Sequence, residues 1–306
     1  MIQEYFGNAT YYTTTLLEYP FKNKCGRVFQ IANNFMIHFP NAKINIGLNI
    51  VEKRNDGFHS IETIFYPIGL SDVLEFVEGE KVEMKSSGIT IDEDWQQNLC
   101  VRAYRLLAND FHLPSIIIYL HKIIPIGAGL GGGSSDATYM LKMLNAHFYL
   151  KLSVEKLQYY ARQLGSDCAF FINNNPVFAC GRGDEFSAIS LDLKNYFLVL
   201  ITPEIHINTA EAYSNVSPVK PLFSLRKNIQ LPIEQWKNCI HNDFEISVCK
   251  KYAEIKTIKE ELYSFGATYA SMSGSGSSVY GIFKSTPDMQ AMQVHFLGNK
   301  IWVGKL

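Results

Sequence analysis

Pro125-Ile-Gly-Ala-Gly-Leu-Gly-Gly-Gly-Ser-Ser-Asp136 is the stretch of sequence that decides the fold. It follows residues 116–124, a run rich in β-branched side chains that predicts a strand ending at the proline. Beyond Ser135 the apolar residues recur every three or four positions, as they do on one face of a helix. The glycines therefore lie in a turn between a strand and an amphipathic helix.

A glycine-rich junction of this kind is typical of a phosphate-binding loop. Glycine lets backbone N–H groups approach an anion closely. The start of the following helix adds unpaired N–H donors and the positive end of the helix dipole. Residues 127–135 contain five glycines and two serines. A merely flexible turn would not need so many, so we interpret the segment as an anion site.

Other phosphate loops fit the sequence less well. Gly127, Gly129 and Gly132 match the GxGxxG spacing of dinucleotide-binding folds. That fingerprint also needs an acidic residue at the end of the next strand, whereas residues 147–153 have the pattern of a helix end and a linker. No Lys-Ser or Lys-Thr pair closes the glycines, which excludes a Walker A loop, and the HRD and DFG signatures of protein kinases are absent.

A second informative segment, residues 41–51, alternates between apolar and polar side chains. Alternation over this length predicts a half-buried strand. Lys43 and Asn45 then lie side by side on its polar face. Asn55-Asp56-Gly57 follows and predicts a turn.

The remaining patterns mix helices and strands. Helical periodicity and capping residues predict helices over 101–111, 153–164 and 257–265. Residues 196–201 are apolar and predict a buried strand, and residues 218–232 predict a loop. This mixture indicates an α+β protein of two lobes.

Three segments resemble, in order, the three motifs of the galactokinase–homoserine kinase–mevalonate kinase–phosphomevalonate kinase (GHMP) superfamily. They are Asn41-Ala-Lys-Ile-Asn-Ile-Gly-Leu48, the glycine loop Pro125 to Ser135, and Met272-Ser-Gly-Ser-Gly-Ser-Ser278. The resemblance covers residues 36–306. It implies an α+β GHMP kinase fold, with an N-terminal ribosomal-protein-like ATP-binding lobe at 36–190 and a C-terminal ferredoxin-like lobe at 191–306.

The segment Arg54-Asn-Asp-Gly-Phe-His-Ser-Ile-Glu-Thr63 narrows the resemblance to one branch of these kinases. Its members transfer phosphate from ATP to the 2-hydroxyl of 4-diphosphocytidyl-2-C-methyl-D-erythritol, in the non-mevalonate route to isopentenyl diphosphate. The resemblance implies this small molecule and ATP as the partners, with Mg²⁺ as the metal. It is compatible with a monomer or a homodimer.

The same resemblance gives Lys43 and Asp167 the roles of catalytic lysine and catalytic aspartate. The chemistry is reasonable, because the attacking hydroxyl must lose a proton and a positioned carboxylate can accept it. A nearby lysine keeps that carboxylate ionised and stabilises developing negative charge. Without the resemblance, Asp167 would be interpreted as a helix cap after Gly165, and Lys43 as a solvated strand lysine.

Ligand-binding residues follow from the resemblance as well. It implies that a cytosine lies between the rings of Phe58 and Tyr213 and that His59 binds its edge. Asn45 and Thr209 match polar contacts to the substrate. The residues that match the ATP site are Asn98, Pro125, Gly127, Ala128, Gly129, Leu130, Gly131, Gly132, Gly133, Ser134 and Ser135. The third motif contributes Ser273, Gly274, Ser275 and Gly276.

The sequence departs from the family pattern at three places. Phe58 stands where tyrosine is usual, which keeps the stacking and loses a hydroxyl group. Cys168-Ala169 follows Asp167 where Val-Pro is common. Residues 1–35 have no counterpart. Clear strand patterning begins only near Ile37, so we expect residues 1–35 to be an upstream extension and Met36 to be the natural start.

Composition limits the class of protein. The chain has 306 residues, 47% of them apolar, and a net charge of only -1, which disfavours a nucleic-acid partner. Its six cysteines form no CxxC pair and are expected to be free thiols in a reducing cytoplasm. No apolar run reaches the roughly 18 residues of a membrane span, and no secretory signal precedes the patterned region.

Two other functions remain open at the level of sequence. One is another small-molecule kinase of the superfamily, such as a homoserine or mevalonate kinase. The other is a non-catalytic nucleotide-binding or RNA-binding module on the same fold. Phe58-His59 suits a cytidine pocket, and the presence of both Lys43 and Asp167 favours an enzyme.

Overall fold

The structure is a computed structural model that describes residues 37–214, 216, 218–219, 221 and 224–306. The expected extension at residues 1–35 and the expected start at Met36 lie outside the described residues. Residues 36–306 form one compact unit.

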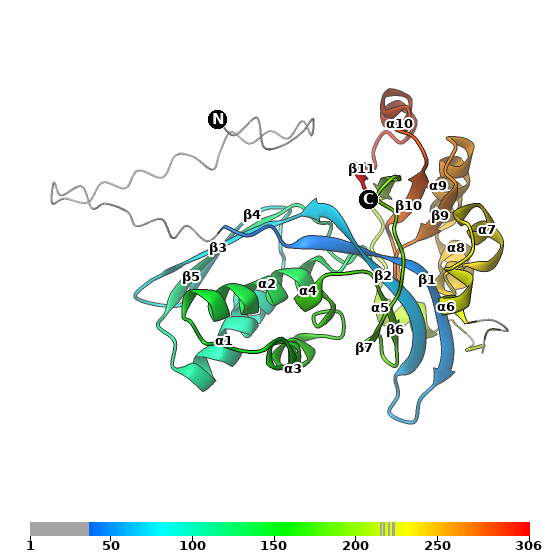
Figure 1. Cartoon of the computed structure of the whole chain (residues 1–306). Helices are drawn as coiled ribbons and strands as arrows, with labels where there is room; N and C mark the ends of the chain where they lie inside the picture. Colours follow the sequence, from blue (N-terminus) through cyan, green and yellow to red (C-terminus); the bar gives the residue numbers. More distant parts are fainter. Residues whose placement is uncertain (1–36, 215, 217, 220, 222–223) are drawn as a thin grey trace. The chain divides into compact units, whose positions relative to one another are not determined.

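The described strands form three sheets (Figure 1). The first has the order β1-β2-β6-β7 and consists of Asn41–Lys53, His59–Ser71, Val177–Cys180 and Glu185–Ala188. The second has the order β3-β5-β4 and consists of Val73–Glu78, Ile116–Lys122 and Glu83–Gly88, with β4 parallel to β5. The third, antiparallel sheet has the order β11-β8-β10-β9 and consists of Lys300–Lys305, Phe197–Thr202, Val279–Phe283 and Tyr269–Met272.

The described helices fall into two groups along the chain. The first group, with the 3₁₀ turn η1 at Trp95–Gln97, consists of α1 (Leu99–Phe111), α2 (Gly132–His147), α3 (Val154–Leu164) and α4 (Phe170–Asn173). The second consists of α5 (Thr209–Ser214), α6 (Leu225–Asn228), α7 (Ile233–Cys239), α8 (Phe244–Lys251), α9 (Ala253–Ser264) and α10 (Met289–His295).

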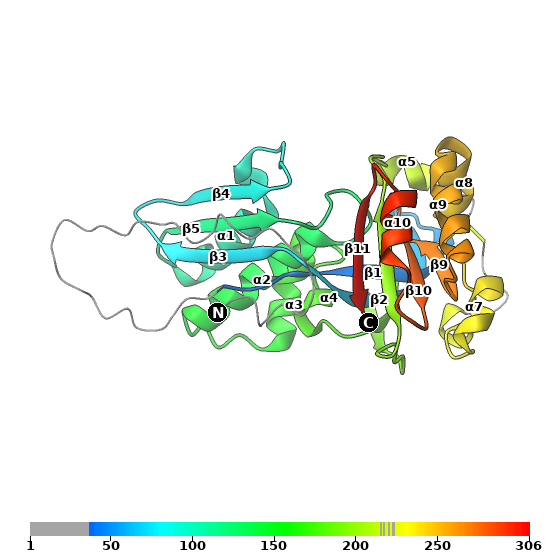
Figure 2. The same cartoon turned by 90° about the horizontal axis from the view of Figure 1, so that it is seen from above.

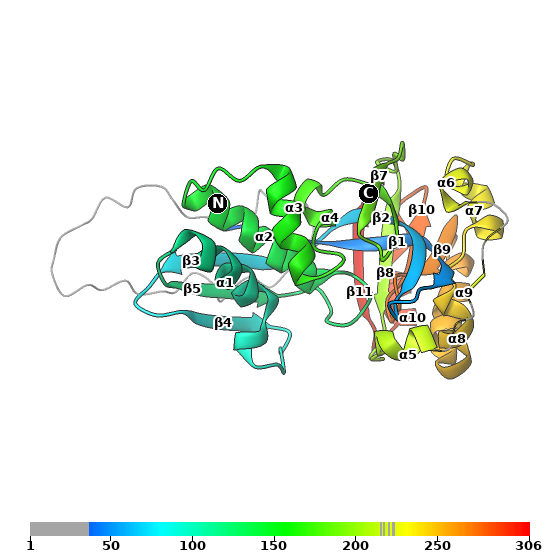
Figure 3. The ribbon, with the colours of Figure 1, turned by 90° about the horizontal axis from the view of Figure 1, so that it is seen from below.

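The first group of helices covers one face of the β3-β5-β4 sheet. Figure 3 shows these helices in front of the sheet, and Figure 2 shows the opposite face. Strand β5 alternates between buried and half-buried positions, so that Ile116, Ile118 and Leu120 point into a core shared with Leu107 of α1 and Leu141 of α2. Period-two burial on one face is what a sheet with helices on one side requires.

Strand β8 is buried on both faces, as its continuous apolar run predicts. Val199 and Ile201 belong to the core that includes α8, α9 and α10, while Leu198 and Leu200 pack into the core formed with β1 and β2. Helices α8 and α9 lie on the outer side of this sheet (Figure 1). Burial of successive residues on opposite faces explains why residues 197–201 are all apolar.

The expectation that β1 is half-buried is wrong, because its polar face is covered as well. Lys43 and Asn45 expose only 3% and 2% of their surface. The Lys43 ammonium donates to the carbonyl of Gly129, and the backbone N–H of Asn45 donates to Ser273 Oγ. Two loops distant in sequence therefore form the cover, which the local alternation of β1 cannot reveal.

Helix boundaries largely follow the capping residues. Asn98 Oδ1 accepts from the N–H of Cys100 at the start of α1, and Ser153 Oγ accepts from the N–H of Lys156 at the start of α3. The loop expected at 218–232 is partly wrong, because it contains α6. Ser224 caps this short helix, and burial of Leu225 provides its packing.

The expected α+β class is confirmed by the order and packing of these elements. The division into lobes at 36–190 and 191–306 stays a prediction. In the part of the chain that the structure describes, no helix combines the length and the apolar character that crossing a membrane requires.

The backbone at Gly129 generates a test of the fold. This residue has φ +77°, and an added Cβ would lie 2.0 Å from the carbonyl oxygen of Ser273. A left-handed conformation costs an L-residue about 1–2 kcal/mol even without such a clash. We expect Gly129→Ala to lower Tm by several degrees in a thermal unfolding measurement.

Gly133→Ala is the matched control for that substitution. Its added Cβ would lie 3.7 Å from the nearest side-chain atom, Leu99 Cδ1, and the residue is helical. Its Tm is expected to stay constant or rise, since alanine is the better helix former. Equal Tm changes in the two variants would contradict the packing described for Gly129.

Candidate active site

The glycine loop is held in place by its own carbonyl groups. The carbonyl oxygen of Gly129 accepts from Ser273 Oγ at 2.9 Å and from Lys43 Nζ at 3.2 Å. The carbonyl oxygen of Leu130 accepts from the backbone N–H of Lys43 at 3.0 Å. The loop is thus tied to β1 and to the third-motif loop without using any side chain of its own.

The amide groups of the same loop are left without acceptors. Within the described residues, none accepts a hydrogen bond from the N–H groups of residues 127–131. Helix α2 begins directly after Gly131, and no side chain caps its start. A row of unpaired N–H groups leading into a helix N-terminus is a suitable place for phosphate oxygens.

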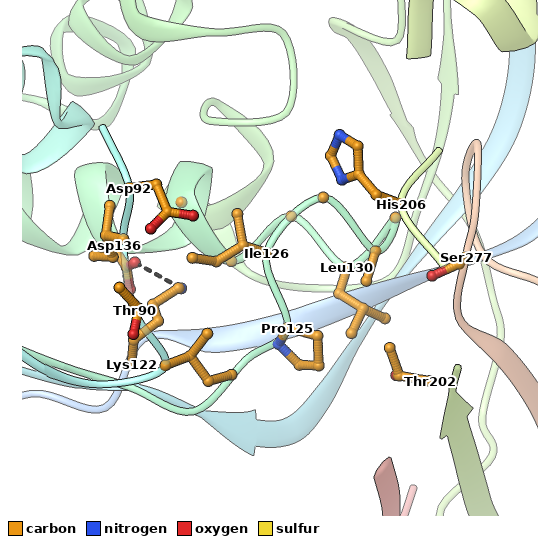
Figure 4. A pocket seen from close by; sticks show the side chains of 18 of the residues that line it. Thr90, Asp92, Lys122, Pro125, Ile126, Leu130, Asp136, Thr202, His206 and Ser277 are labelled. Carbon is orange, nitrogen blue, oxygen red and sulfur yellow. Dashed lines mark hydrogen bonds and ion pairs between the residues drawn. The ribbon is translucent and has the colours of Figure 1, made fainter. Parts of the chain in front are cut away.

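Two cavities lie on either side of this loop. The first has a volume of about 750 Å³ and is lined by residues 125–134, by Asn98 and by residues 202–206 (Figure 4). The second has a volume of about 620 Å³ and contains Lys43 and Asp167. Gly127, Gly129 and Gly131 line both cavities. Ligands in the two cavities would therefore meet at the loop.

Lys43 and Asp167 form an ion pair in the second cavity. Nζ lies 3.3 Å from Asp167 Oδ2, and the side-chain exposures are 4% for Lys43 and 33% for Asp167. The buried ammonium also donates to Asn45 Oδ1 at 2.6 Å and lies 4.9 Å from the ring centre of Phe65. The lysine is fixed, and the carboxylate is accessible from the cavity.

The ordinary interpretation of Asp167 as a helix cap does not agree with the geometry. Helix α4 begins at Phe170, and its N-cap position is Ala169, without a side-chain cap. The Asp167 carboxylate instead faces Lys43. Similarly, Lys43 is buried rather than solvated.

Asn45 is oriented by a short chain of hydrogen bonds. Its Nδ2 donates to Thr63 Oγ1 at 2.9 Å, and the Thr63 hydroxyl donates to the carbonyl of Gly47 at 2.7 Å. This fixes the amide so that Oδ1 faces Lys43. Asn45 therefore positions the lysine and also lines the second cavity.

The side chain of Asn242 holds the third-motif loop, residues 272–278, in place. Its Nδ2 donates to the carbonyls of Met272 and Gly274, at 2.9 and 2.8 Å. Gly274 and Ser275 then line the second cavity, and Ser275 Oγ lies 3.2 Å from Thr209 Oγ1. The other two motif residues, Ser273 and Gly276, do not line either cavity.

The aromatic residues of the second cavity are arranged differently from the expected sandwich. Tyr213 stacks on His59, with ring centres 4.9 Å apart and an interplanar angle of 15°. Phe58 is 56% exposed and lies under the guanidinium of Arg182 at 5.1 Å. Phe58 precedes strand β2, which begins at His59, and both residues line the same cavity as Tyr213. That cytosine binds between Phe58 and Tyr213 stays a prediction.

The Tyr213 phenol remains protonated at neutral pH. Burial of the side chain, together with the nearby negative charge of Asp167, raises the pKa of Tyr213 to about 12. Its hydroxyl can therefore donate a hydrogen bond to a ligand.

Of the remaining residues expected at the ATP site, all but one line the first cavity. Asn98 and the loop from Pro125 to Ser134 line the first cavity. Ser135 does not line it, and its hydroxyl is buried without a hydrogen-bond partner among the described residues.

Several cavity residues were not expected from the sequence. Lys53 and Arg182 add positive charge to the second cavity, and His206 lies beside Gly127 at the edge of the first. Figure 4 shows His206 and Lys122 at opposite ends of the view. None of them belongs to a recognisable motif. Only the Gly181-Arg-Gly183 spacing indicates a tight turn that could present a side chain.

Comparison with known proteins identifies the class. Residues 98–175 match the family model "GHMP kinases N terminal domain", and residues 226–296 match "GHMP kinases C terminal". The first match contains the glycine loop and Asp167, and the second contains the third motif. The site and fold are thus those of a GHMP kinase.

Curated relatives narrow the assignment. A 4-diphosphocytidyl-2-C-methyl-D-erythritol kinase of Bacteroides fragilis is 52% identical over 265 residues, covering 85% of this chain and 96% of the relative. One from Azobacteroides pseudotrichonymphae is 56% identical over 250 residues, covering 81% and 94%. The chain belongs to the 4-diphosphocytidyl-2-C-methyl-D-erythritol kinase family.

Solved structures agree in fold. A crystal structure of 4-(cytidine 5'-diphospho)-2C-methyl-D-erythritol kinase superposes with a TM-score of 0.76 at 28% identity, covering 88% of this chain and 98% of that one. The mevalonate kinase of Methanococcus jannaschii has a TM-score of 0.64 at 16% identity, covering 90% and 99%. The second likeness shows the shared fold alone.

Proposed function

We propose that this kinase transfers the γ-phosphoryl group of ATP to the 2-hydroxyl of 4-diphosphocytidyl-2-C-methyl-D-erythritol, giving the 2-phosphate and ADP. The observation that carries the proposal is the Lys43–Asp167 pair, 3.3 Å apart, in a cavity that shares the glycine loop with a second cavity. Family membership supplies the substrate class. A cytoplasmic location and a monomeric or dimeric state stay predictions.

ATP would occupy the first cavity. Its phosphates would accept from the unpaired N–H groups of residues 127–131 and from the start of α2. Asn98 lines another part of this cavity, where the adenine base would bind. In this proposed arrangement the terminal phosphate would lie at the loop, next to the second cavity.

The chemical step uses the second cavity. The substrate hydroxyl attacks the γ-phosphorus, so that a new O–P bond forms and the bond to ADP breaks. Asp167 accepts the hydroxyl proton, which is the role that its 33% exposure and its contact with Lys43 permit. The Lys43 ammonium, held by Asn45, stabilises negative charge on the transferring group.

The cytidyl part of the substrate would bind at the aromatic end of the second cavity. Phe58 and Tyr213 would provide the ring faces on either side of the cytosine, and His59 would bind its edge. A base that inserts there exchanges the His59–Tyr213 contact for a contact with the base. Thr209 lies beside these rings and can contact the substrate hydroxyl groups.

Mg²⁺ is proposed to enter with the nucleotide. No group of three or more His, Cys, Asp or Glu side chains that could hold a metal occurs among the residues described here. Mg²⁺ usually keeps several waters and binds through substrate phosphates rather than through a protein cage. When bound, it would neutralise charge on the ATP phosphates.

A panel of acceptors tests the substrate. With Mg-ATP, ADP release is expected with 4-diphosphocytidyl-2-C-methyl-D-erythritol and not with mevalonate, homoserine or galactose. Turnover with one of the other acceptors would keep the kinase chemistry and overturn the substrate. Nucleotide binding without any turnover would favour the non-catalytic module.

Asp167→Asn tests the general base. An amide cannot accept the proton, so kcat should fall about 100- to 10,000-fold, while ADP affinity measured by calorimetry stays within a few-fold. Asp192→Asn, which changes an exposed carboxylate, is the control and should leave kcat unchanged. A near wild-type kcat in Asp167→Asn would show that another group accepts the proton.

Tyr213→Ala tests the aromatic wall. Because stacking contributes about 1–3 kcal/mol per base, KM for the cytidyl substrate should rise several-fold or more, with KM for ATP unchanged. Tyr213→Phe keeps the ring and should retain most of the affinity. Equal rises in both KM values would mean that the substitution acts through the fold and not through the base.

A further inference from the structure

Both ends of the glycine loop are connected to one buried ammonium group. Lys122 is the last residue of β5, immediately before the loop, and Asp136 lies near the start of α2, immediately after it. Lys122 Nζ is 2.9 Å from Asp136 Oδ2. Figure 4 shows this contact as a dashed line at one end of the first cavity. Through this contact the two ends of the loop are held at a fixed distance from each other.

Asp72, at the corner between β2 and β3, completes the cluster. One of its carboxylate oxygens pairs with Lys122 Nζ. The other accepts from the backbone N–H groups of Ile123 and Ile124, at 2.5 and 2.8 Å. Asp72 therefore fixes the chain where it enters the loop, and Asp136 fixes the chain where it leaves.

The charge of the cluster is unbalanced if every group is ionised. The exposed fractions are 0% for Asp72, 4% for Lys122 and 3% for Asp136, so solvent reaches none of them effectively. Two carboxylates then face one ammonium. Asp136 Oδ1 is buried and has no hydrogen-bond partner in the described part of the chain. A buried charge without a partner is strongly unfavourable.

We propose that Asp136 is a positioning residue that fixes the span of the glycine loop through Lys122, and that it does so as the uncharged carboxylic acid. The cluster is then one ion pair, Asp72 with Lys122, and one neutral acid that accepts from the ammonium. The effect on ATP binding rests on the proposed function, whereas the protonation state does not.

The charged and titratable surroundings agree with this assignment. Burial, reinforced by the charge of Asp72 and only partly offset by Lys122, raises the pKa of Asp136 to about 8. Burial opposes the charge on Lys122, but its contacts with Asp136 and Asp72 outweigh burial and raise the pKa of Lys122, so the ammonium persists. Burial also raises the pKa of Cys100, on α1, which keeps that thiol neutral. Asp92 lines the same cavity but is exposed.

The first test measures Tm against pH and needs no substrate. An acid whose pKa is higher in the folded than in the unfolded chain adds stability at low pH, and this stability is lost as the pH rises towards 8. Asp136→Asn keeps an oxygen for Lys122 and cannot ionise. Its Tm should match wild type near pH 4, exceed it by a growing margin as the pH rises to about 8, and keep that margin near pH 9. If the difference in Tm between Asp136→Asn and wild type does not change with pH, the proposal that Asp136 is uncharged is wrong.

The second test separates positioning from general stability. Asp136→Ala breaks the link between the loop ends, and misplacement of a reacting group by about 1 Å can cost about 100-fold in rate. We therefore expect kcat/KM for ATP to fall by up to about 100-fold and Kd for ADP to rise, with KM for the cytidyl substrate little changed. Asp136→Asn should restore wild-type ADP affinity at pH 7.

Asp92→Asn is the matched control, since it changes an exposed aspartate of the same cavity. It should leave Tm against pH unchanged. If Asp136→Asn were as damaging as Asp136→Ala at pH 6, the ionised carboxylate would be the working form and the proposal would fail. If a folded Asp136→Ala protein bound ADP with unchanged affinity, the proposal that Asp136 positions the glycine loop would be wrong. Neither Tm against pH nor the affinity for ADP requires the acceptor. Both measurements therefore test the proposal even if the acceptor is another small molecule.

Discussion

The carbonyl oxygen of Gly129 is the point on which the active site depends. It accepts from Ser273 of the third motif and from Lys43 of the first, so three segments far apart in the chain meet at one atom. The contact is possible only because Gly129 has no Cβ and a positive φ. Once the loop is held by its carbonyls, its N–H groups remain for a ligand. One backbone geometry thus brings Lys43 and the proposed phosphate site together.

The Lys43–Asp167 pair combines a rigid and an accessible partner. Lys43 is surrounded by Asn45, the Gly129 carbonyl and the Phe65 ring, which leaves its ammonium little freedom. Asp167 is a third exposed, so solvent weakens its attraction to Lys43 relative to a fully buried pair. A carboxylate held less tightly is better able to exchange its partner for an incoming hydroxyl proton. The asymmetry of burial therefore suits the different roles that we propose for Lys43 and Asp167.

Local patterns in the sequence were sufficient for the elements that depend on nearest neighbours. The strand, glycine loop and helix around Pro125–Ser135 follow from composition and period, and so do the caps Asn98 and Ser153. The motifs also predicted several residues that line one of the two cavities, such as Lys43, Asn98 and Asp167. Contacts between distant segments could not be predicted in this way. The cover over β1 comes from residues more than 80 positions away.

The directions in which side chains point could not be predicted from the sequence either. Phe58 and His59 are adjacent and both aromatic, and nothing in their order tells which of them faces Tyr213. The pairing of Asp72 with Lys122 spans 50 positions and carries no motif of its own. The loop at 218–232 contains a helix because Ser224 and Leu225 find partners in the fold.

The two cavities share a wall made of glycine, and this has a consequence for inhibition. Gly127, Gly129 and Gly131 line both sides, so at these three residues the partition between the proposed nucleotide and acceptor cavities has no side chains. A single molecule that joins an adenosine phosphate to a cytidine phosphate could therefore cross the partition and fill both cavities. Such a bisubstrate compound would incur the entropy of association once for two binding surfaces, so its affinity would far exceed that of either half. It would also distinguish this enzyme from kinases that bind adenine alone.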